Sequence, residues 1–208
     1  MKFGKTVAIV LTSTVLLAGC TTDKKEIKKY DNQVQKAFDQ EKSVNSTSKK
    51  INDLEEKKQK LFKKVNGKDQ NTRKQAAEDI VKNVEKRQKE FKIEEQALNN
   101  SEKEFKKAKQ YMNHIDNSAK KKEVTQLNDA LKEKYEAHDA YAKAYKKALN
   151  KEKELFTFLN QYGATQSEVD SKSKDLSKAY KDMNKKFNTY SKAMRKVTQE
   201  KQDVDQLK

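Results

Sequence analysis

A helical pattern runs through residues 77–115, AEDIVKNVEKRQKEFKIEEQALNNSEKEFKKAKQYMNHI. Apolar side chains recur in this segment every seven residues, and a companion row lies three positions further on. The first row is Ala77, Val84, Phe91, Leu98, Phe105 and Met112, and the second contains Ile80, Ala108 and Ile115. Both rows fall on one face of a helix, because seven residues are close to two helical turns. We therefore expect a long helix that packs along this face.

Two further segments show the same seven-residue spacing. The C-terminal rows are Val169, Leu176, Met183, Tyr190, Val197 and Val204, with Tyr180, Phe187 and Met194. The segment between 77–115 and the C-terminal rows has one row of Val124, Leu131, Tyr145 and Leu159, and a second of Leu127, Tyr141, Ala148, Leu155 and Tyr162. Residues 27–65 are apolar at less regular steps, and Glu41 and Ser48 stand where apolar residues are expected. We interpret 27–65 as a helix with a looser central contact.

Turn residues separate these four segments. Gly67 lies in an Asn-Gly-Lys-Asp turn, after which Asn71 or Thr72 is available as an N-cap. Gly163 suits the left-handed position that ends a helix, and residues 165–168 match a capping box. The third boundary, 116–118, has no glycine, so the helices on either side either separate there or run on.

The predicted fold is all-α, an elongated antiparallel coiled-coil-like bundle of about four long helices with no sheet. It forms a single domain from residue 30 to residue 208. Composition agrees, because the chain has no Pro, no Trp, four Gly and only 33% hydrophobic residues. That content is too low for a conventional enzyme core, and the alternative is a disordered chain. Three sustained heptad series favour the bundle over disorder.

The N-terminus has the features of an export signal. Lys2 and Lys5 precede a short apolar run at 7–17, which is too short to span a membrane. The residues that follow, Leu17, Ala18, Gly19 and Cys20, resemble a bacterial lipobox. The resemblance implies cleavage after residue 19 and a diacylglyceryl lipid on Cys20, with 20–29 as a lipidated tether. The alternative is an ordinary secretory signal with a fortuitous cysteine.

Lysine dominates the charge of the chain. Lys and Arg number 48 against 32 Asp and Glu, a formal net charge of +16. An exported chain with so few arginines is not expected to bind nucleic acid. Anionic wall polymers such as teichoic acids, and anionic lipid headgroups, are the polyanions such a surface would meet. The triplet Lys120, Lys121 and Lys122 is a candidate anion-binding site, and the alternative is a solvated surface that keeps the bundle soluble.

The sequence offers no catalytic or metal-binding constellation. His114 and His138 lie on different predicted helices without neighbouring ligands at metal spacing, and His138 fits a buried packing position. Polar residues Arg87, Glu94 and Glu152 interrupt the apolar rows and are expected to set helix register or to flank the core. Tyr135, Tyr141, Tyr145 and Tyr162 could stack on a ligand but fit core packing better. We expect no enzyme activity, no metal and no cofactor apart from the lipid.

The lipobox, the lysine-rich heptads that follow it and the Tyr-Asp-Asn segment at 30–32 resemble the YkyA-type cell-wall-binding lipoproteins of Gram-positive bacteria. The resemblance implies an all-helical lipoprotein on the outer face of the cytoplasmic membrane. We expect a non-catalytic module that binds or spaces the cell wall. The alternative is an adaptor or chaperone-like bundle that binds an exported or envelope protein in a groove left open near residues 41–48.

Overall fold

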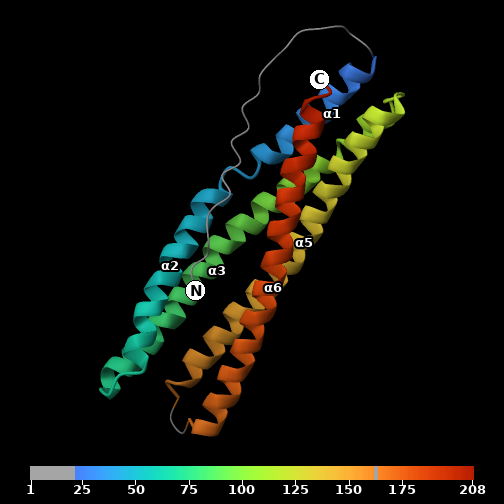
Figure 1. Ribbon diagram of the computed structural model, residues 1–208. Coiled ribbons are helices and arrows are strands. Elements are labelled where there is room, and N and C mark those ends of the chain that lie inside the picture. Colours follow the sequence, from blue (N-terminus) through green and yellow to red (C-terminus); the bar gives the residue numbers. More distant parts are fainter. Residues whose placement is uncertain (1–21, 162–163) are drawn as a thin grey trace. The chain divides into compact units, whose positions relative to one another are not determined.

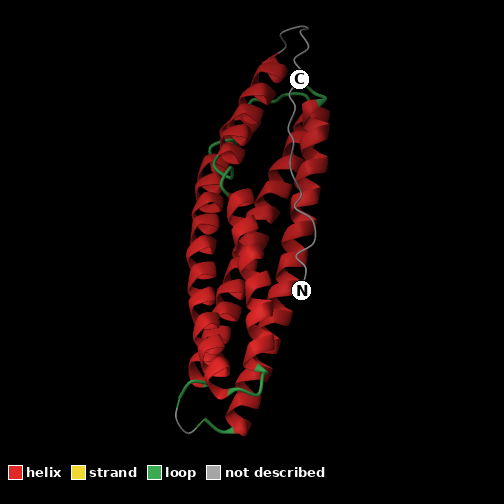
Figure 2. Ribbon diagram, turned by 90° about the vertical axis from the view of Figure 1, so that its left-hand side faces the viewer, coloured by secondary structure: helices red, strands yellow, loops and turns green. Residues whose placement is uncertain are grey.

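The computed structural model describes residues 22–161 and 164–208, and within them it contains only helices and connecting turns (Figure 2). Figure 1 labels most of the helices along the chain. Their bounds are α1 Thr22–Asp39, α2 Val44–Val65, α3 Gln70–Lys106, α4 Lys109–Met112, α5 Ser118–Phe158 and α6 Gln166–Asp205. The all-α prediction is confirmed.

The first predicted helix differs from the expectation in two ways. It is broken at residues 40–43, where turns separate α1 from α2. Its start also lies earlier, because α1 begins at Thr22, inside the segment we expected to be a tether. Ile27 explains the early start: its side chain is fully buried, so the first turns of α1 pack against a core instead of linking to it.

Side-chain caps fix the starts of the long helices. Asp69, not Asn71 or Thr72, caps α3, since its Oδ1 accepts from the backbone N–H of Thr72 at 2.7 Å. The uncertain boundary at 116–118 is a true break, and Asn117 Oδ1 accepts from the N–H of Lys120 at 3.0 Å. The predicted capping box of α6 is present, with Thr165 and Glu168 bonded to each other's backbone N–H. Gly163 lies outside the described residues.

The described chain divides into two compact units that share its long helices, and the single domain predicted for residues 30–208 stays a prediction. Of the described residues, unit 1 contains 22–45, 96–139 and 188–208, and unit 2 contains 46–95, 140–161 and 164–187. Each of the long helices α3, α5 and α6 contributes one part to each unit, whereas α1 belongs to unit 1 and α2 to unit 2, apart from its first two residues. The break at 40–43 thus divides the first predicted helix into α1, which lies in unit 1, and α2, most of which lies in unit 2.

Neighbouring helices within a unit are antiparallel. In unit 2, Glu85, Gln88 and Glu95 of α3 contact Lys153, Asn150 and Lys146 of α5, so one set of numbers rises as the other falls. In unit 1, Glu133 contacts Lys196 at 2.9 Å, and the ring centroids of His138 and Tyr190 lie 5.2 Å apart. These contacts give α5 and α6 the same antiparallel relation.

The apolar rows predicted from the sequence form the two cores. In unit 1 the core combines Ile27, Tyr30 and Val34 of α1 with side chains of α3, α5 and α6. Leu98 and Phe105, the fourth and fifth members of the first predicted row, belong to it. In unit 2 the Phe91 ring meets Tyr145 edge to face, with centroids 4.6 Å apart. Burying one such side chain stabilises the fold by roughly 1.5–3 kcal/mol. About one apolar side chain per turn of each helix, on the face toward its neighbours, can therefore build each core.

Candidate functional site

The predicted lipidation residues, Leu17, Ala18, Gly19 and Cys20, lie outside the described residues. Cys20 precedes the first residue of α1, Thr22, by two positions. The anchor we predict is therefore attached almost directly to unit 1. In the part of the chain that the structure describes, no helix has the length and apolar character needed to cross a membrane.

The predicted anion-binding lysines lie in the first turns of α5. Lys121 and Lys122 are exposed and Lys120 is half-buried. Within 22–161 and 164–208 none of the three forms an ion pair. Asn117, which caps the same helix end, fixes the position of the triplet through the backbone of Lys120. The three ammonium groups are thus available to an external anion.

Buried charges gather where Arg87 of α3 meets α2 and α5 in unit 2. The Arg87 guanidinium, which is fully buried, donates from Nη2 to Glu152 at 2.7 Å and from Nη1 to Glu55. Its Nε also donates to Asn83 Oδ1 at 2.8 Å. Asn83 in turn donates to the backbone carbonyl of Leu54 at 2.8 Å. Arg87 therefore links three helices through directional bonds.

Lys58 and Tyr180 complete this group. Lys58 Nζ lies 2.5 Å from Glu55 and 3.7 Å from Glu152, and it donates to the Tyr180 hydroxyl at 3.0 Å. The Tyr180 hydroxyl donates to Glu152. Two cations thus face two carboxylates, so the group is neutral as a whole. We call Arg87, Lys58, Glu55, Glu152 and Tyr180 the unit 2 network.

Burial and charge shape the ionisation of the unit 2 network. Burial lowers the pKa of Arg87, but the carboxylates of Glu152 and Glu55 outweigh it and raise the pKa overall. Burial raises the pKa of Tyr180, and the neighbouring Glu152 charge raises it further. Arg87 therefore stays charged and Tyr180 stays a proton donor. With Arg87 and Glu152 fully buried, the network is suited to fixing helix register.

The sequence identified part of this network. Arg87 and Glu152 were expected to set register, and the structure brings them together; Glu94 is also buried. Glu55 and Lys58 were missed. Their signal is spacing, since both follow the buried Ile51 on the same face of α2, four and seven residues later.

A second polar group lies in unit 1 beside the break between α1 and α2. Glu41 accepts hydrogen bonds from Lys134 and Ser101, both at 2.5 Å. The oxygens of Ser101 and Tyr135 lie 2.7 Å apart. Since the one serine proton goes to Glu41, the Tyr135 hydroxyl donates to Ser101. We call Glu41, Ser101, Lys134 and Tyr135 the unit 1 network.

Polar Glu41 therefore does not leave the neighbouring apolar row open. Within unit 1 the row residue Leu98 is 1% exposed, and in unit 2 Phe91 is also 1% exposed. Among the described residues only Ile93 is an exposed large apolar side chain. The row residues are thus covered within each unit, and a groove for an envelope protein near residues 41–48 stays a prediction.

The tyrosines and His138 pack as expected in the cores. Tyr135, Tyr141 and Tyr145 are buried, and Tyr162 lies outside the described residues. His138 is 2% exposed and its ring meets Tyr190 edge to face. These aromatic rings serve packing rather than an open ligand face.

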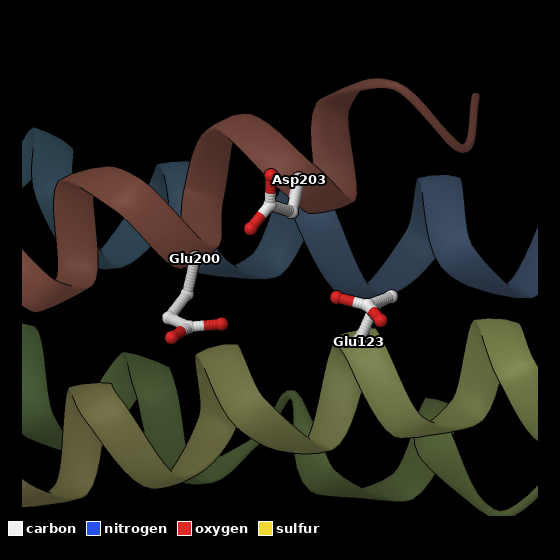
Figure 3. A group of neighbouring side chains, drawn as sticks. All are labelled: Glu123, Glu200 and Asp203. Atoms are coloured by element: carbon white, nitrogen blue, oxygen red, sulfur yellow. The ribbon is translucent and has the colours of Figure 1, made fainter.

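Three carboxylates gather at the surface of unit 1. Figure 3 shows Glu123 of α5 reaching toward Glu200 and Asp203 of α6. One oxygen from each lies within 4.8 Å of the others. Glu123 and Glu200 are half-buried and Asp203 is exposed. Acidic groups at a surface are common without a bound ion, so the cluster alone assigns no metal site.

Comparisons with known proteins agree with the lysine-rich helical architecture. The YkyA family model, described as "Putative cell-wall binding lipoprotein", matches residues 25–207. The chain belongs to the YkyA family. This confirms the resemblance inferred from the sequence, and the family description implies a lipoprotein of the cell envelope.

A solved structure supports membership at the level of the fold. A conserved protein of unknown function from Staphylococcus aureus is 49% identical, with a TM-score of 0.81. The similarity covers 90% of this chain and 97% of that one. A comparison with curated proteins finds no match.

Proposed function

We propose that this YkyA-family chain is a lipoprotein held on the outer face of the Gram-positive cytoplasmic membrane by a diacylglyceryl group on Cys20. It binds or spaces the cell wall without catalysis, through exposed lysines that contact anionic wall polymer. The family description, a cell-wall-binding lipoprotein, supports the general role. The lipobox at residues 17–20 supports the anchor.

The observation that carries the proposal is the excess of exposed lysines without acidic partners. Lys121 and Lys122 in unit 1 and Lys60, Lys64 and Lys174 in unit 2 are exposed. None of these five forms an ion pair among the described residues. Ammonium groups of this kind attract phosphate-rich polymers in a salt-dependent way.

The polar networks support a non-catalytic role. Arg87 and Glu152 are fully buried, and Ser101 is fully buried in unit 1, so a substrate would reach these groups only by separating packed helices. The alternative, an adaptor for an envelope protein, relied on an apolar groove near residues 41–48. Because the apolar rows are covered, charge rather than a groove is the better basis for binding.

Co-sedimentation with purified cell walls tests the proposal. The chain from residue 20 onward, without lipid, contains every described core residue, the first of which is Ile27. We expect it to sediment with walls that carry teichoic acid, and to be released by salt as the charges are screened. Walls stripped of teichoic acid are the matched control. Failure to bind intact walls at low salt, or equal binding to stripped walls, contradicts the proposal.

A further inference from the structure

Covalent geometry places the predicted lipid close to one end of unit 1. Cys20 precedes Thr22 by two positions, so their Cα atoms lie at most about 7 Å apart. The first turn of α1 is therefore next to the bilayer surface once Cys20 is acylated. This step rests on the lipid anchoring in the proposed function.

A pair of hydrogen bonds brings the start of α5 to the same place. The Asp23 carboxylate in the first turn of α1 accepts from the backbone N–H of Asp116 at 2.9 Å and of Asn117 at 3.2 Å. Asn117 then caps α5 through the N–H of Lys120. The first turns of α1 and α5 thus lie side by side, and the Lys120–Lys122 triplet is at the anchored end.

The lysines at this end have few acidic partners. Lys25 and Lys28 of α1 and Lys121 and Lys122 of α5 are exposed. None of the four forms an ion pair within the described ranges. Of the nearby acids, Asp23 accepts from two amides and Glu26 binds Lys29 at 2.7 Å. Glu123 of α5 reaches toward Glu200 and Asp203 of α6 and, in the part of the chain described, forms no ion pair with the four lysines.

Position within the helix sharpens this point. The first turn of α5 contains no acidic residue, and Lys121 and Lys122 stand near the positive end of its dipole. Cations there are unfavourable within the protein itself. An external anionic surface would offset this unfavourable interaction between the lysines and the helix dipole. Lys25 and Lys28 lie about 4.5 and 9 Å along α1 from Thr22, at 1.5 Å per residue, which is within roughly one Debye length of the first residue of the helix.

We propose that Lys25, Lys28, Lys121 and Lys122 form a membrane-binding patch that contacts the anionic headgroups of the bilayer in which the Cys20 lipid is inserted. Acyl chains and a basic patch together hold a protein more firmly and in a more defined orientation than acyl chains alone. The patch reassigns two of the predicted wall-binding lysines to lipid and leaves wall binding to lysines elsewhere.

Vesicle binding of the unlipidated chain from residue 20 onward tests the patch independently of the anchor. The patch variant replaces Lys25, Lys28, Lys121 and Lys122 with Gln. The control variant replaces Lys60, Lys64, Lys174 and Lys181 in unit 2, which are also exposed and without ion pairs among the described residues. Both variants lose the same charge. Circular dichroism during heating checks that each variant folds like wild type.

We expect wild type to bind phosphatidylcholine vesicles that contain phosphatidylglycerol, and not those of phosphatidylcholine alone. Each lysine near an anionic membrane raises the affinity for it roughly fivefold. The affinity of the patch variant for these vesicles should therefore be at least about 30-fold lower than that of wild type. The affinity of the control variant should be lower than that of wild type by less than about fivefold. Equal losses in the two variants, or wild-type binding by the patch variant, would overturn the proposal.

Sedimentation of the same three proteins with cell walls separates this inference from the proposed function. Retained wall binding by the patch variant, together with lost vesicle binding, supports both. If no protein binds walls but the vesicle result holds, the wall-binding function fails and the membrane patch stands. If the patch variant loses wall binding and keeps vesicle binding, these lysines bind wall polymer and the inference is wrong.

Discussion

The two units place polar groups in their helix interfaces in different ways. In unit 2 the network consists of four charges, and both Arg87 and Glu152 are fully buried. In unit 1 the network has one cation and one anion, Lys134 and Glu41, joined to two hydroxyls. Glu41 also keeps 17% of its side chain exposed, beside the break between α1 and α2. Unit 2 thus depends on complete charge pairing, whereas unit 1 retains access to water.

This difference predicts how each unit responds to the loss of one partner. A buried carboxylate without a cation cannot recover hydration, so the cost of removal is large. A partly exposed carboxylate can exchange its lost partner for water, so the cost is smaller. Removing one cation from each network therefore tests how much burial raises the free-energy cost of an unpaired carboxylate.

The largest effect should follow Arg87→Met. The change keeps much of the side-chain volume but leaves Glu55 and Glu152 with only Lys58 as a cation. We expect the free energy of unfolding to fall by about 3–5 kcal/mol. Lys134→Met in unit 1 is the matched variant and should cost about 1–3 kcal/mol, since Glu41 keeps the Ser101 hydrogen bond. Urea unfolding measures both, and equal losses would refute the comparison.

Much of the fold follows from the spacing of apolar residues. The rows that begin at Ala77 and Val124 are buried apart from the half-buried Met112 and Leu159 at their C-terminal ends, since a narrow bundle needs only one apolar face per helix. The break at 40–43 could not be predicted this way. Its residues include no Gly or Pro, and the helix ends where Glu41 turns toward Lys134 and Ser101, partners more than 50 positions away.

The candidate sites also differ in whether the sequence alone can predict them. The lipobox and the lysine triplet are local in sequence, so they could be named without a structure. The network partners of Arg87 depend on the register of α2 against α3, which the turn after Val65 sets in three dimensions. The proximity of Lys121 to the start of α1 likewise depends on the Asp23 hydrogen bonds to residues 116 and 117. Spacing after Ile51 places Glu55 and Lys58 on the buried face of α2, but it does not pair them with Arg87.

Removal of single hydroxyls sharpens the comparison at an intermediate scale. Tyr180→Phe deletes hydrogen bonds to the charged groups of Glu152 and Lys58, and should cost about 1.5–3 kcal/mol. Tyr135→Phe in unit 1 deletes a bond to the neutral Ser101, and should cost about 0.5–1.5 kcal/mol.

Tyr145→Phe is the control for these changes. The Tyr145 hydroxyl is buried without a hydrogen-bond partner among the described residues. Its removal relieves an unsatisfied group, so stability should equal or exceed that of wild type. Urea unfolding of the three variants should rank them in this order, and a loss for Tyr145→Phe as large as that for Tyr180→Phe would show that ring packing rather than hydrogen bonding sets the cost.

The smallest effect should come from charges at the rim of unit 1. Burial raises the pKa of Asp205, but hydrogen bonds from Lys201 and Lys208 outweigh it, so the folded pKa is lowered overall. A lowered carboxyl pKa contributes stability above its unfolded value, near 4, which is lost as pH falls through the folded value. The Asp205 side chain is 38% exposed, so this contribution is below about 1 kcal/mol.

Asp205→Asn therefore separates rim charges from buried ones. The difference in unfolding free energy between wild type and this variant should be present at neutral pH and should disappear as the pH falls below about 4. The pKa of Lys208 is raised, so its share is lost only in strongly alkaline solution and the neutral range is a plateau. Added salt should shrink the difference, since exposed ions are screened. A difference that stays constant from acid to neutral pH would mean that Asp205 acts through packing, and the contrast between rim and buried charges would not apply to it.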